Sequence, residues 1–258
     1  MLTKDLAICI RAVDYSETSQ VVTFFTRRTG KIGAIAKGSK RPKSAFGGPL
    51  EMLSYGRIVF SDSSDKSDSS REKLAALTEF EPACDDPDSA GLRNDLFALN
   101  GCLFAAELLN QLTDDYDPHP GLFDRFLQFL HDAGQNQDRR GMLALLLLFQ
   151  LGLLTEVGLQ PVLNHCPNCK TKYEYRASSI EHPVYFSSSA NGLVCRDCEP
   201  NFPDRIRLSR NAAACLTSLK QIPEAAEKTL TEIQKIFVHH FTELLGRPLK
   251  MAKHVLKG

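Results

Sequence analysis

The sequence predicts a multi-domain α+β protein in which an all-β domain comes first and an all-α domain follows. Three observations predict this class. Strand-like stretches fill residues 3–80, apolar residues recur at helical spacing from Leu92 onward, and two Cys-x2-Cys pairs interrupt the helical part. We expect a first domain of residues 1–82 and a helical domain of residues 83–258.

Five strands are expected in the first domain because each stretch alternates in polarity or is rich in β-branched and aromatic residues. They are residues 3–13, Gln20–Thr26, Lys31–Lys37, Leu50–Ser61 and Lys73–Phe80. Alternation places Leu6, Ile8 and Ile10 on one face of the first strand, and Ala7, Cys9 and Arg11 on the other. Five short strands without a helix-length repeat indicate a small closed barrel. The OB-fold is the economical choice, and an SH3-like barrel is the alternative.

The segment before the fifth strand, Ser61–Ser70, is polar and of low complexity. This composition favours a disordered hairpin tip, and a cluster of phosphorylation sites is the alternative.

Helical spacing predicts five helices and a short final turn in the second domain. They are Leu92–Leu112, Pro118–Asp132, Gln137–Val157, Ser209–Lys220, Pro223–Leu245 and a turn within Leu249–Lys257. The first helix should turn Leu96, Leu99 and Leu103 inward, and the third is apolar nearly all round, which suits the centre of a bundle. Ser209 is a candidate N-cap, and Pro223 suits a first helical turn.

Four cysteines form two pairs, Cys166-x2-Cys169 and Cys195-x2-Cys198, separated by 25 residues. Two intervening residues let both thiolates of a pair reach one ion, and four thiolates complete the tetrahedral shell of Zn²⁺. We expect one structural zinc ion in an insert at about residues 163–200. Four thiolates leave no position for water, so the ion should hold the fold rather than catalyse.

The remaining cysteines and the nearby histidines are not expected to bind metal. They are Cys9, Cys84, Cys102, Cys215, His165 and His182. The four cysteines are scattered, which is typical of small apolar residues in cores.

A one-sided charge distribution marks residues 27–44. The cations are Arg27, Arg28, Lys31, Lys37, Lys40, Arg41 and Lys43. No acid falls between Glu17 and Glu51, although the chain has 31 basic and 31 acidic residues in total. A solvated hairpin edge would carry both signs, so this stretch predicts a polyanion partner, and nucleic acid is the commonest one.

Aromatic residues flank the basic stretch, and they would let a barrel stack bases while its cations follow phosphates. They are Tyr15, Phe24, Phe25, Phe46 and Tyr55. Because Phe24 and Phe25 are adjacent on one strand, one of them must lie in the core. Tyr15 or Phe46 is therefore the expected exposed ring.

Motifs of common enzymes and membrane proteins are missing from the sequence. It has no phosphate-binding loop, nucleophile elbow, zinc-protease helix or zinc-deaminase signature, so we expect no enzyme activity. Asp114, Asp115 and Asp117 could form a two-metal nuclease site, but helix capping is the simpler interpretation. The N-terminus lacks a signal-peptide pattern, and the longest apolar run, Met142–Phe149, is too short for a membrane span. A cytoplasmic, nucleoid-associated protein is expected.

Three segments resemble the N-terminal signature of the bacterial DNA repair protein RecO family. They are Arg11–Ser19, Val21–Thr26 and Ala36–Ser44, and the resemblance extends to the Leu-rich helix and the four paired cysteines. It implies an OB-fold followed by a helical domain with a zinc module. Among the cations, Lys37, Lys40, Arg41 and Lys43 match the family motif, whereas Arg27, Arg28 and Lys31 are added by the charge argument.

The resemblance also implies a function. Members of this family are recombination mediators that bind single- and double-stranded DNA and anneal complementary strands. They work with RecR, engage the acidic C-terminal tail of the single-strand-binding protein SSB, and help load RecA. Two alternatives remain: an adaptor that docks acidic protein tails without catalysis, and a zinc-dependent nuclease.

Overall fold

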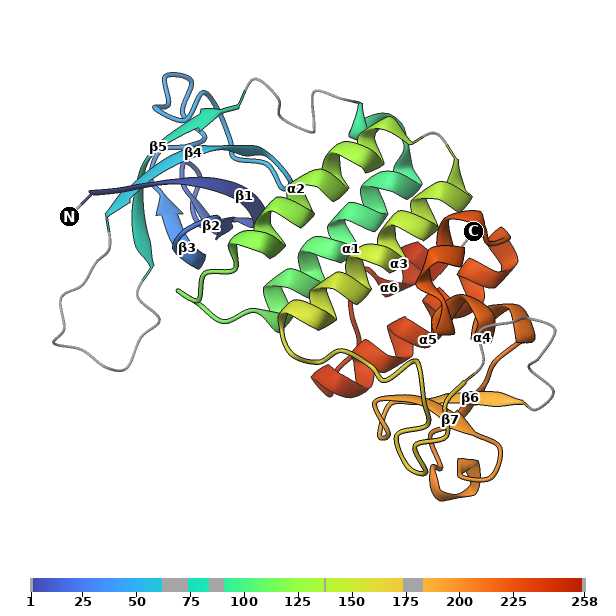
Figure 1. The fold of residues 1–258 in the computed structure, drawn as a ribbon. Helices are drawn as coiled ribbons and strands as arrows, with labels where there is room; N and C mark the ends of the chain where they lie inside the picture. Colours follow the sequence, from blue (N-terminus) through green and yellow to red (C-terminus); the bar gives the residue numbers. More distant parts are fainter. Residues whose placement is uncertain (1, 62–73, 84–90, 137, 174–182, 257–258) are drawn as a thin grey trace, which may run out of the picture. The chain divides into compact units, whose positions relative to one another are not determined.

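The computed structural model describes residues 2–61, 74–83, 91–136, 138–173 and 183–256 (Figure 1). The chain divides into two compact units, Met1–Gln135 and Asn136–Gly258. The first unit therefore contains the barrel and two helices. The domain boundary after residue 82 remains a prediction. Most of Ser61–Ser70, together with Cys84 and His182, lies outside the described residues.

The first unit is built on a closed five-stranded barrel, as predicted (Figure 1). Its strands are β1 (Leu2–Asp14), β2 (Gln20–Thr26), β3 (Gly30–Ala36), β4 (Tyr55–Ser61) and β5 (Ala75–Pro82). They follow the order β1-β2-β3-β5-β4, in which β3 and β5 pair in parallel and the other neighbours are antiparallel. The fourth strand begins at Tyr55 rather than Leu50. Leu53, with φ 72°, lies in the preceding loop.

Two apolar faces shape this barrel. Ile32, Ala34 and Ala36 point into its interior, as the alternation predicted. Phe24 lies in the same interior and stacks on Phe80, with ring centroids 6.1 Å apart. Neighbouring side chains on a strand point to opposite faces, so the outer face is apolar as well.

The outer face explains why two expected aromatic sites are closed. Phe25 is fully buried against Phe123, with ring centroids 6.1 Å apart. Phe46 is also buried, in the barrel core. Tyr15 is the aromatic residue of the predicted set that stands exposed, at 68%.

Helices α1 (Leu96–Leu112) and α2 (Pro120–Gln135) complete the first unit and pack on β1 and β2. A 3-10 turn, η2 (Leu92–Asn94), precedes α1. The carboxylate of Asp95 accepts hydrogen bonds from the backbone N–H groups of Phe97 and Ala98, so the helix begins after this N-cap and not at Leu92. Leu96 is 72% exposed, which corrects its predicted inward position.

The second unit contains the remaining helices and the cysteine insert. The helices are α3 (Arg139–Glu156), α4 (Arg210–Thr217), η4 (Leu219–Glu224), α5 (Glu227–Leu245) and α6 (Ala252–Leu256). The nearly all-apolar α3 packs against α5. Ser209 caps α4 by accepting from the N–H of Ala212, as predicted. Pro223 lies inside η4 instead, and α5 begins at Glu227.

A buried histidine lies on α5 of the second unit. His240 is fully buried, and its ring meets the ring of Phe186 edge-on with centroids 5.1 Å apart. Neither ring nitrogen has a hydrogen-bond partner among the described residues. Burial, and secondarily the neighbouring His239, lowers the pKa of His240 to about 4.

Acid should therefore destabilise the second unit through His240. Between pH 6.5 and 4 the unfolded chain binds a proton at this position and the folded chain does not, so stability is complete above pH 6.5 and falls as the pH drops toward 4. The loss should reach about 3 kcal/mol. We expect His240→Leu to flatten the free energy of unfolding across this interval, as measured by urea denaturation at several pH values. His254→Leu, at an exposed position, should keep the wild-type profile, and an equally steep profile in both variants would contradict the prediction.

Candidate nucleic-acid interface and metal centre

The basic stretch separates into two groups at opposite ends of the β2–β3 hairpin. The strands pair from Gln20 with Ala36 at one end to Thr26 with Gly30 at the other. Arg27, Arg28 and Lys31 belong to the turn end, whereas the other four cations follow Ala36. Six residues of strand place the two groups ~20 Å apart.

At the turn end, Lys31 holds the end of α1. Its side chain is 12% exposed, and Nζ donates hydrogen bonds to the carbonyl oxygens of Asn110 and Thr113 at 3.0 and 2.6 Å. Nζ also lies 3.3 Å from a carboxylate oxygen of Asp115. A cation beside the last carbonyl groups of a helix stabilises that terminus. The ammonium group of Lys31 is thus engaged within the protein.

Arg27, at the same end, is held by α2. Its Nε and Nη2 donate to the two carboxylate oxygens of Asp124, each at 2.8 Å. This paired hydrogen bonding lowers the pKa of Asp124 and raises that of Arg27. Both Arg27 and Lys31 therefore connect the barrel to its helices, while Arg28 is exposed. Their assignment to DNA binding remains a prediction that these bonds do not favour.

The other group forms a loop anchored on the β1–β2 turn, and we call residues 37–43 the cationic loop. Its backbone is fixed by hydrogen bonds from the Lys40 N–H to the Thr18 carbonyl (3.1 Å) and from the Gly38 N–H to Ser19 Oγ (3.2 Å). The Ser39 hydroxyl donates to Gln20 at 2.9 Å. The loop therefore lies beside the turn that carries the exposed Tyr15 ring.

The side chains of the cationic loop are largely open to solvent. Lys37, Arg41 and Lys43 are exposed. Lys40 is partly buried and pairs with the carboxylate of Asp14 at 2.7 Å. Exposed cations next to an exposed aromatic ring can hold phosphates and stack a base.

Arg11 is a further exposed cation that the strand pattern missed. Alternation assigned it to the face of Ala7 and Cys9, which point into the barrel. The pairing of β1 with β2 shifts register between Cys9 and Arg11, and such a bulge turns the following side chains over. Arg11 therefore points outward, four residues before Tyr15.

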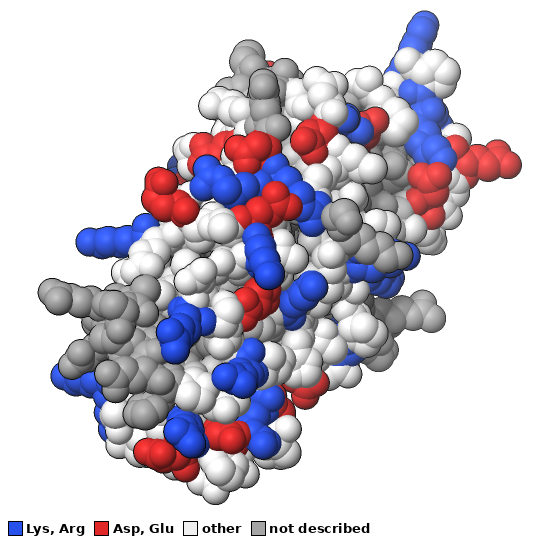
Figure 2. All heavy atoms as spheres, turned by 90° about the vertical axis from the view of Figure 1, so that its right-hand side faces the viewer, with Lys and Arg blue, Asp and Glu red and all other residues white. Residues whose placement is uncertain are grey.

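Cations and acids are mixed on another face of the molecule. Figure 2 shows Lys and Arg side chains interspersed with Asp and Glu there. This agrees with a formal net charge of zero, so a polyanion site has to be local.

The metal centre consists of Cys166, Cys169, Cys195 and Cys198, as predicted. Their sulfur atoms all lie within 4.8 Å of one another, and Cys169 and Cys195 are 3.6 Å apart. A tetrahedral ion with metal–sulfur bonds of ~2.3 Å has sulfurs ~3.8 Å apart. The four thiols therefore fit a single metal ion.

Hydrogen bonds around the sulfurs support the thiolate form that a metal requires. Bonds from the side chain and backbone of Thr171 lower the pKa of Cys169 to about 6. Burial works to raise the pKa of Cys166, but backbone N–H groups, including those of Cys169 and Asn168, outweigh it and lower that pKa. Burial raises the pKa of Cys195 to about 12 when no cation is present. An ion would supply the charge that ionises this last thiol.

A small sheet supports the centre. Strands β6 (Val184–Ser187), β7 (Gly192–Cys195) and β8 (Ile206–Arg207) form it in the order β7-β6-β8 (Figure 1). The insert therefore reaches Arg207, past the predicted residue 200. Its core contains Cys166, Val194 and Cys198 with few other apolar residues, so cross-linking by a metal would add substantially to its stability.

The alternative acidic metal site has no support among the described residues, where the four cysteines are the group with metal-binding spacing. Asp115 pairs with Lys31, and Asp117 with His119 at 3.0 Å. His165 is outside the cysteine group and contacts Asn164. Cys9, Cys102 and Cys215 are buried apolar residues, as predicted.

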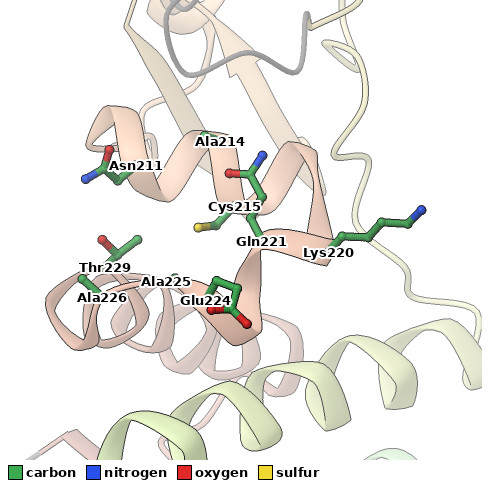
Figure 3. Close-up of a pocket in the computed structure, with 9 residues that line it drawn as sticks. All are labelled: Asn211, Ala214, Cys215, Lys220, Gln221, Glu224, Ala225, Ala226 and Thr229. Atoms are coloured by element: carbon green, nitrogen blue, oxygen red, sulfur yellow. The ribbon is translucent and has the colours of Figure 1, made fainter.

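The second unit also has a pocket of about 370 Å³ between α4, η4 and the start of α5 (Figure 3). Cys215 and Thr229 point toward the space between the helices, while Lys220 points away from it. With Glu224 as a further lining residue, this pocket has no excess of positive charge for a polyanion. Across the described part of the chain, no helix has the length and apolar character needed to cross a membrane.

Comparisons with known proteins agree with this architecture. Residues 1–79 match the family described as Recombination protein O N terminal, and residues 93–252 match Recombination protein O C terminal. A DNA repair protein RecO from Bacillus subtilis (strain 168) is 29% identical over 257 residues, covering 97% of this chain and 92% of the relative. Another, from Anaeromyxobacter sp. (strain K), is 31% identical over 255 residues, covering 94% and 91%.

Lys31→Met should separate a structural from a DNA-binding role. The substitution keeps the aliphatic stem but leaves the carbonyl groups of Asn110 and Thr113 without their donor. We expect the free energy of unfolding, measured with urea, to fall by about 1–3 kcal/mol. Affinity for single-stranded DNA should stay unchanged in conditions where the protein is folded. Lys37→Met, at an exposed position, should show the opposite pattern, and a large DNA-binding loss in Lys31→Met alone would contradict this assignment.

Proposed function

The chain belongs to the RecO family of DNA repair proteins, and on that premise we propose that it is a recombination mediator. In this role it binds single- and double-stranded DNA, anneals complementary strands, and helps load RecA onto DNA coated with SSB. The observation that supports DNA binding is the cationic loop, which lies beside exposed Tyr15 on one end of the barrel.

The chemistry of this loop suits binding without sequence preference. Cations that neutralise phosphates release counterions, and this favours binding to any sequence. Tyr15 can stack on a base of a single strand, because every base offers an aromatic face. Neutralising two backbones lowers the repulsion between complementary strands, which is what annealing requires. The role is stoichiometric, with no catalytic group involved.

Lys37, Arg41 and Lys43 should contribute most of the electrostatic attraction because they are exposed. Lys40 should contribute less, since the carboxylate of Asp14 already lies 2.7 Å from its Nζ. Partner proteins in this proposal are RecR and the acidic tail of SSB, which places the protein in the cytoplasm at the nucleoid. If the chain were instead an adaptor for acidic tails, its affinity for an acidic peptide would exceed its affinity for naked DNA in fluorescence anisotropy.

The metal in this proposal is one Zn²⁺ ion, because four thiolates with two Cys-x2-Cys pairs are its usual structural shell. The ion would join two loops of a ribbon whose own core is small. It would supply structural cross-linking, and its shell would leave no position for water. A zinc-dependent nuclease would need such an open position.

Neutralising the cationic loop should weaken DNA binding for all sequences alike. We expect Lys37→Gln with Arg41→Gln and Lys43→Gln to reduce the steepness of the log–log salt dependence on single strands by ~2, at ~0.7 per phosphate contact. Fluorescence anisotropy over a salt series measures this slope. Undiminished affinity in a variant with wild-type urea stability would refute the loop assignment.

Asp14→Asn tests the same loop in the opposite direction. Removing the carboxylate frees Lys40 and raises the local charge by one, so affinity for single-stranded DNA should rise at low salt. Glu17→Gln is a matched control, because this exposed acid on the same turn removes one charge without freeing Lys40. Equal gains in both variants would mean that net charge, and not release of Lys40, sets the affinity.

Zinc should be present in equal molar amount with the protein and should be lost when a ligand is removed. We expect Cys169→Ser to abolish tight binding and to make the second unit sensitive to proteolysis within residues 162–207, because the ribbon loses its cross-link. Metal analysis after purification without chelators measures the ratio. Cys215→Ser, outside the cluster, should keep one zinc ion, and metal-free wild-type protein would end the proposal.

A further inference from the structure

A second cationic concavity lies on the barrel, away from the cationic loop. Its volume is about 330 Å³, and it is lined by Lys4, Asp5, Leu6, Arg27, Arg28 and Arg57. These residues come from β1, β4 and the turn between β2 and β3. Four of the six lining side chains are therefore cations.

The pairing of β1 and β4 explains why these cations share one surface. Leu6 is opposite Arg57, and Lys4 lies two residues further along β1 on the same face. Diagonal neighbours of this kind are ~7–8 Å apart, and like charges so close repel each other unless an anion lies between them. Arg28 closes the concavity from the hairpin turn.

The acidic residue in the concavity is already fully used by neutral donors. One carboxylate oxygen of Asp5 accepts from the N–H groups of Arg28 and Thr29 and from the Thr29 hydroxyl, at 2.8–3.0 Å. The other accepts from the N–H of Leu6 at 2.9 Å. Asp5 thus fixes the turn that carries Arg28. Within the described residues, neither Lys4 nor Arg28 has an ion-pair partner.

The two remaining arginines differ in how far they are committed. Arg27 is held by both oxygens of Asp124 and forms a fixed wall. Arg57 lies 3.9 Å from Glu81, and both side chains are more than half exposed, so this pair contributes little. Lys4, Arg28 and Arg57 are therefore available to an anion from outside.

Phosphate is the anion that this arrangement fits best. Arginine forks bind phosphate oxygens through two parallel hydrogen bonds, and a lysine adds a point charge. The lining has no aromatic ring on which a base could stack, so the site would hold a backbone and leave the bases free. An acidic peptide would need donors for its main chain as well, and the lining groups are charged side chains.

We propose that Lys4, Arg28 and Arg57 form a second phosphate-binding site on the barrel, which holds the sugar–phosphate backbone of nucleic acid. The site lies ~20 Å or more from the cationic loop, at the other end of the β2–β3 hairpin. It rests on the proposed DNA-binding function and adds a separate contact to it. One barrel thereby contacts two separated stretches of backbone.

The test compares two variants of the full-length protein by fluorescence anisotropy with labelled oligothymidine over a salt series. In the first, Lys4→Gln, Arg28→Gln and Arg57→Gln remove the charge, and we expect at least tenfold weaker binding and a salt slope shallower by ~2. In the second, Arg28→Lys and Arg57→Lys keep the charge. We expect this variant to keep the wild-type slope but to bind several-fold more weakly, because the forks are lost.

A combined variant separates this proposal from the DNA-binding proposal itself. Because the two sites share no residues, the losses from the loop substitutions and from the three Gln substitutions should multiply. Wild-type protein that does not bind DNA would refute the proposed function as a whole. Normal loop behaviour with a fully active Lys4, Arg28 and Arg57 variant would overturn the second site alone. Loss of affinity for a labelled acidic peptide, with DNA binding intact, would overturn it in favour of a protein partner.

Discussion

Burial of the outer face of β1 and β2 is the constraint on which the first unit depends. The barrel has its own interior, yet Ile8 and Phe25 on the outside are fully buried as well. Phe123 of α2 covers this outer face through its contacts with Phe25 and Tyr55. Because large apolar surfaces gain free energy when they leave water, the barrel needs its helices, and the compact unit extends to Gln135.

This covering decides what the nearby cations do. Helices that lie over the hairpin turn bring Asp124 to Arg27 and the end of α1 to Lys31. Those two side chains become part of the packing. At the other end of the hairpin the cationic loop keeps its exposed side chains, anchored by backbone bonds to the β1–β2 turn. A single run of charge in the sequence thus has two different physical roles.

Much of this architecture follows from local sequence pattern, and the exceptions have local causes. Strands, the four-cysteine centre and the Ser209 cap depend on spacing within a few residues, so they were predictable. The outward turn of Arg11 depends on a bulge, and the partners of Lys31 lie about 80 residues away in sequence. Neither strand alternation nor charge counting contains such information. The burial of Phe25 also needed the tertiary contact with α2.

The ion pair between Lys40 and Asp14 gives the cationic loop an internal competitor. Any phosphate that reaches Lys40 must displace a carboxylate held 2.7 Å away, and the carboxylate can return when the phosphate leaves. If the loop carries DNA as proposed, this exchange shortens the residence time of each strand. A mediator has to surrender the strand it delivers, and a partly neutralised grip makes that hand-over fast.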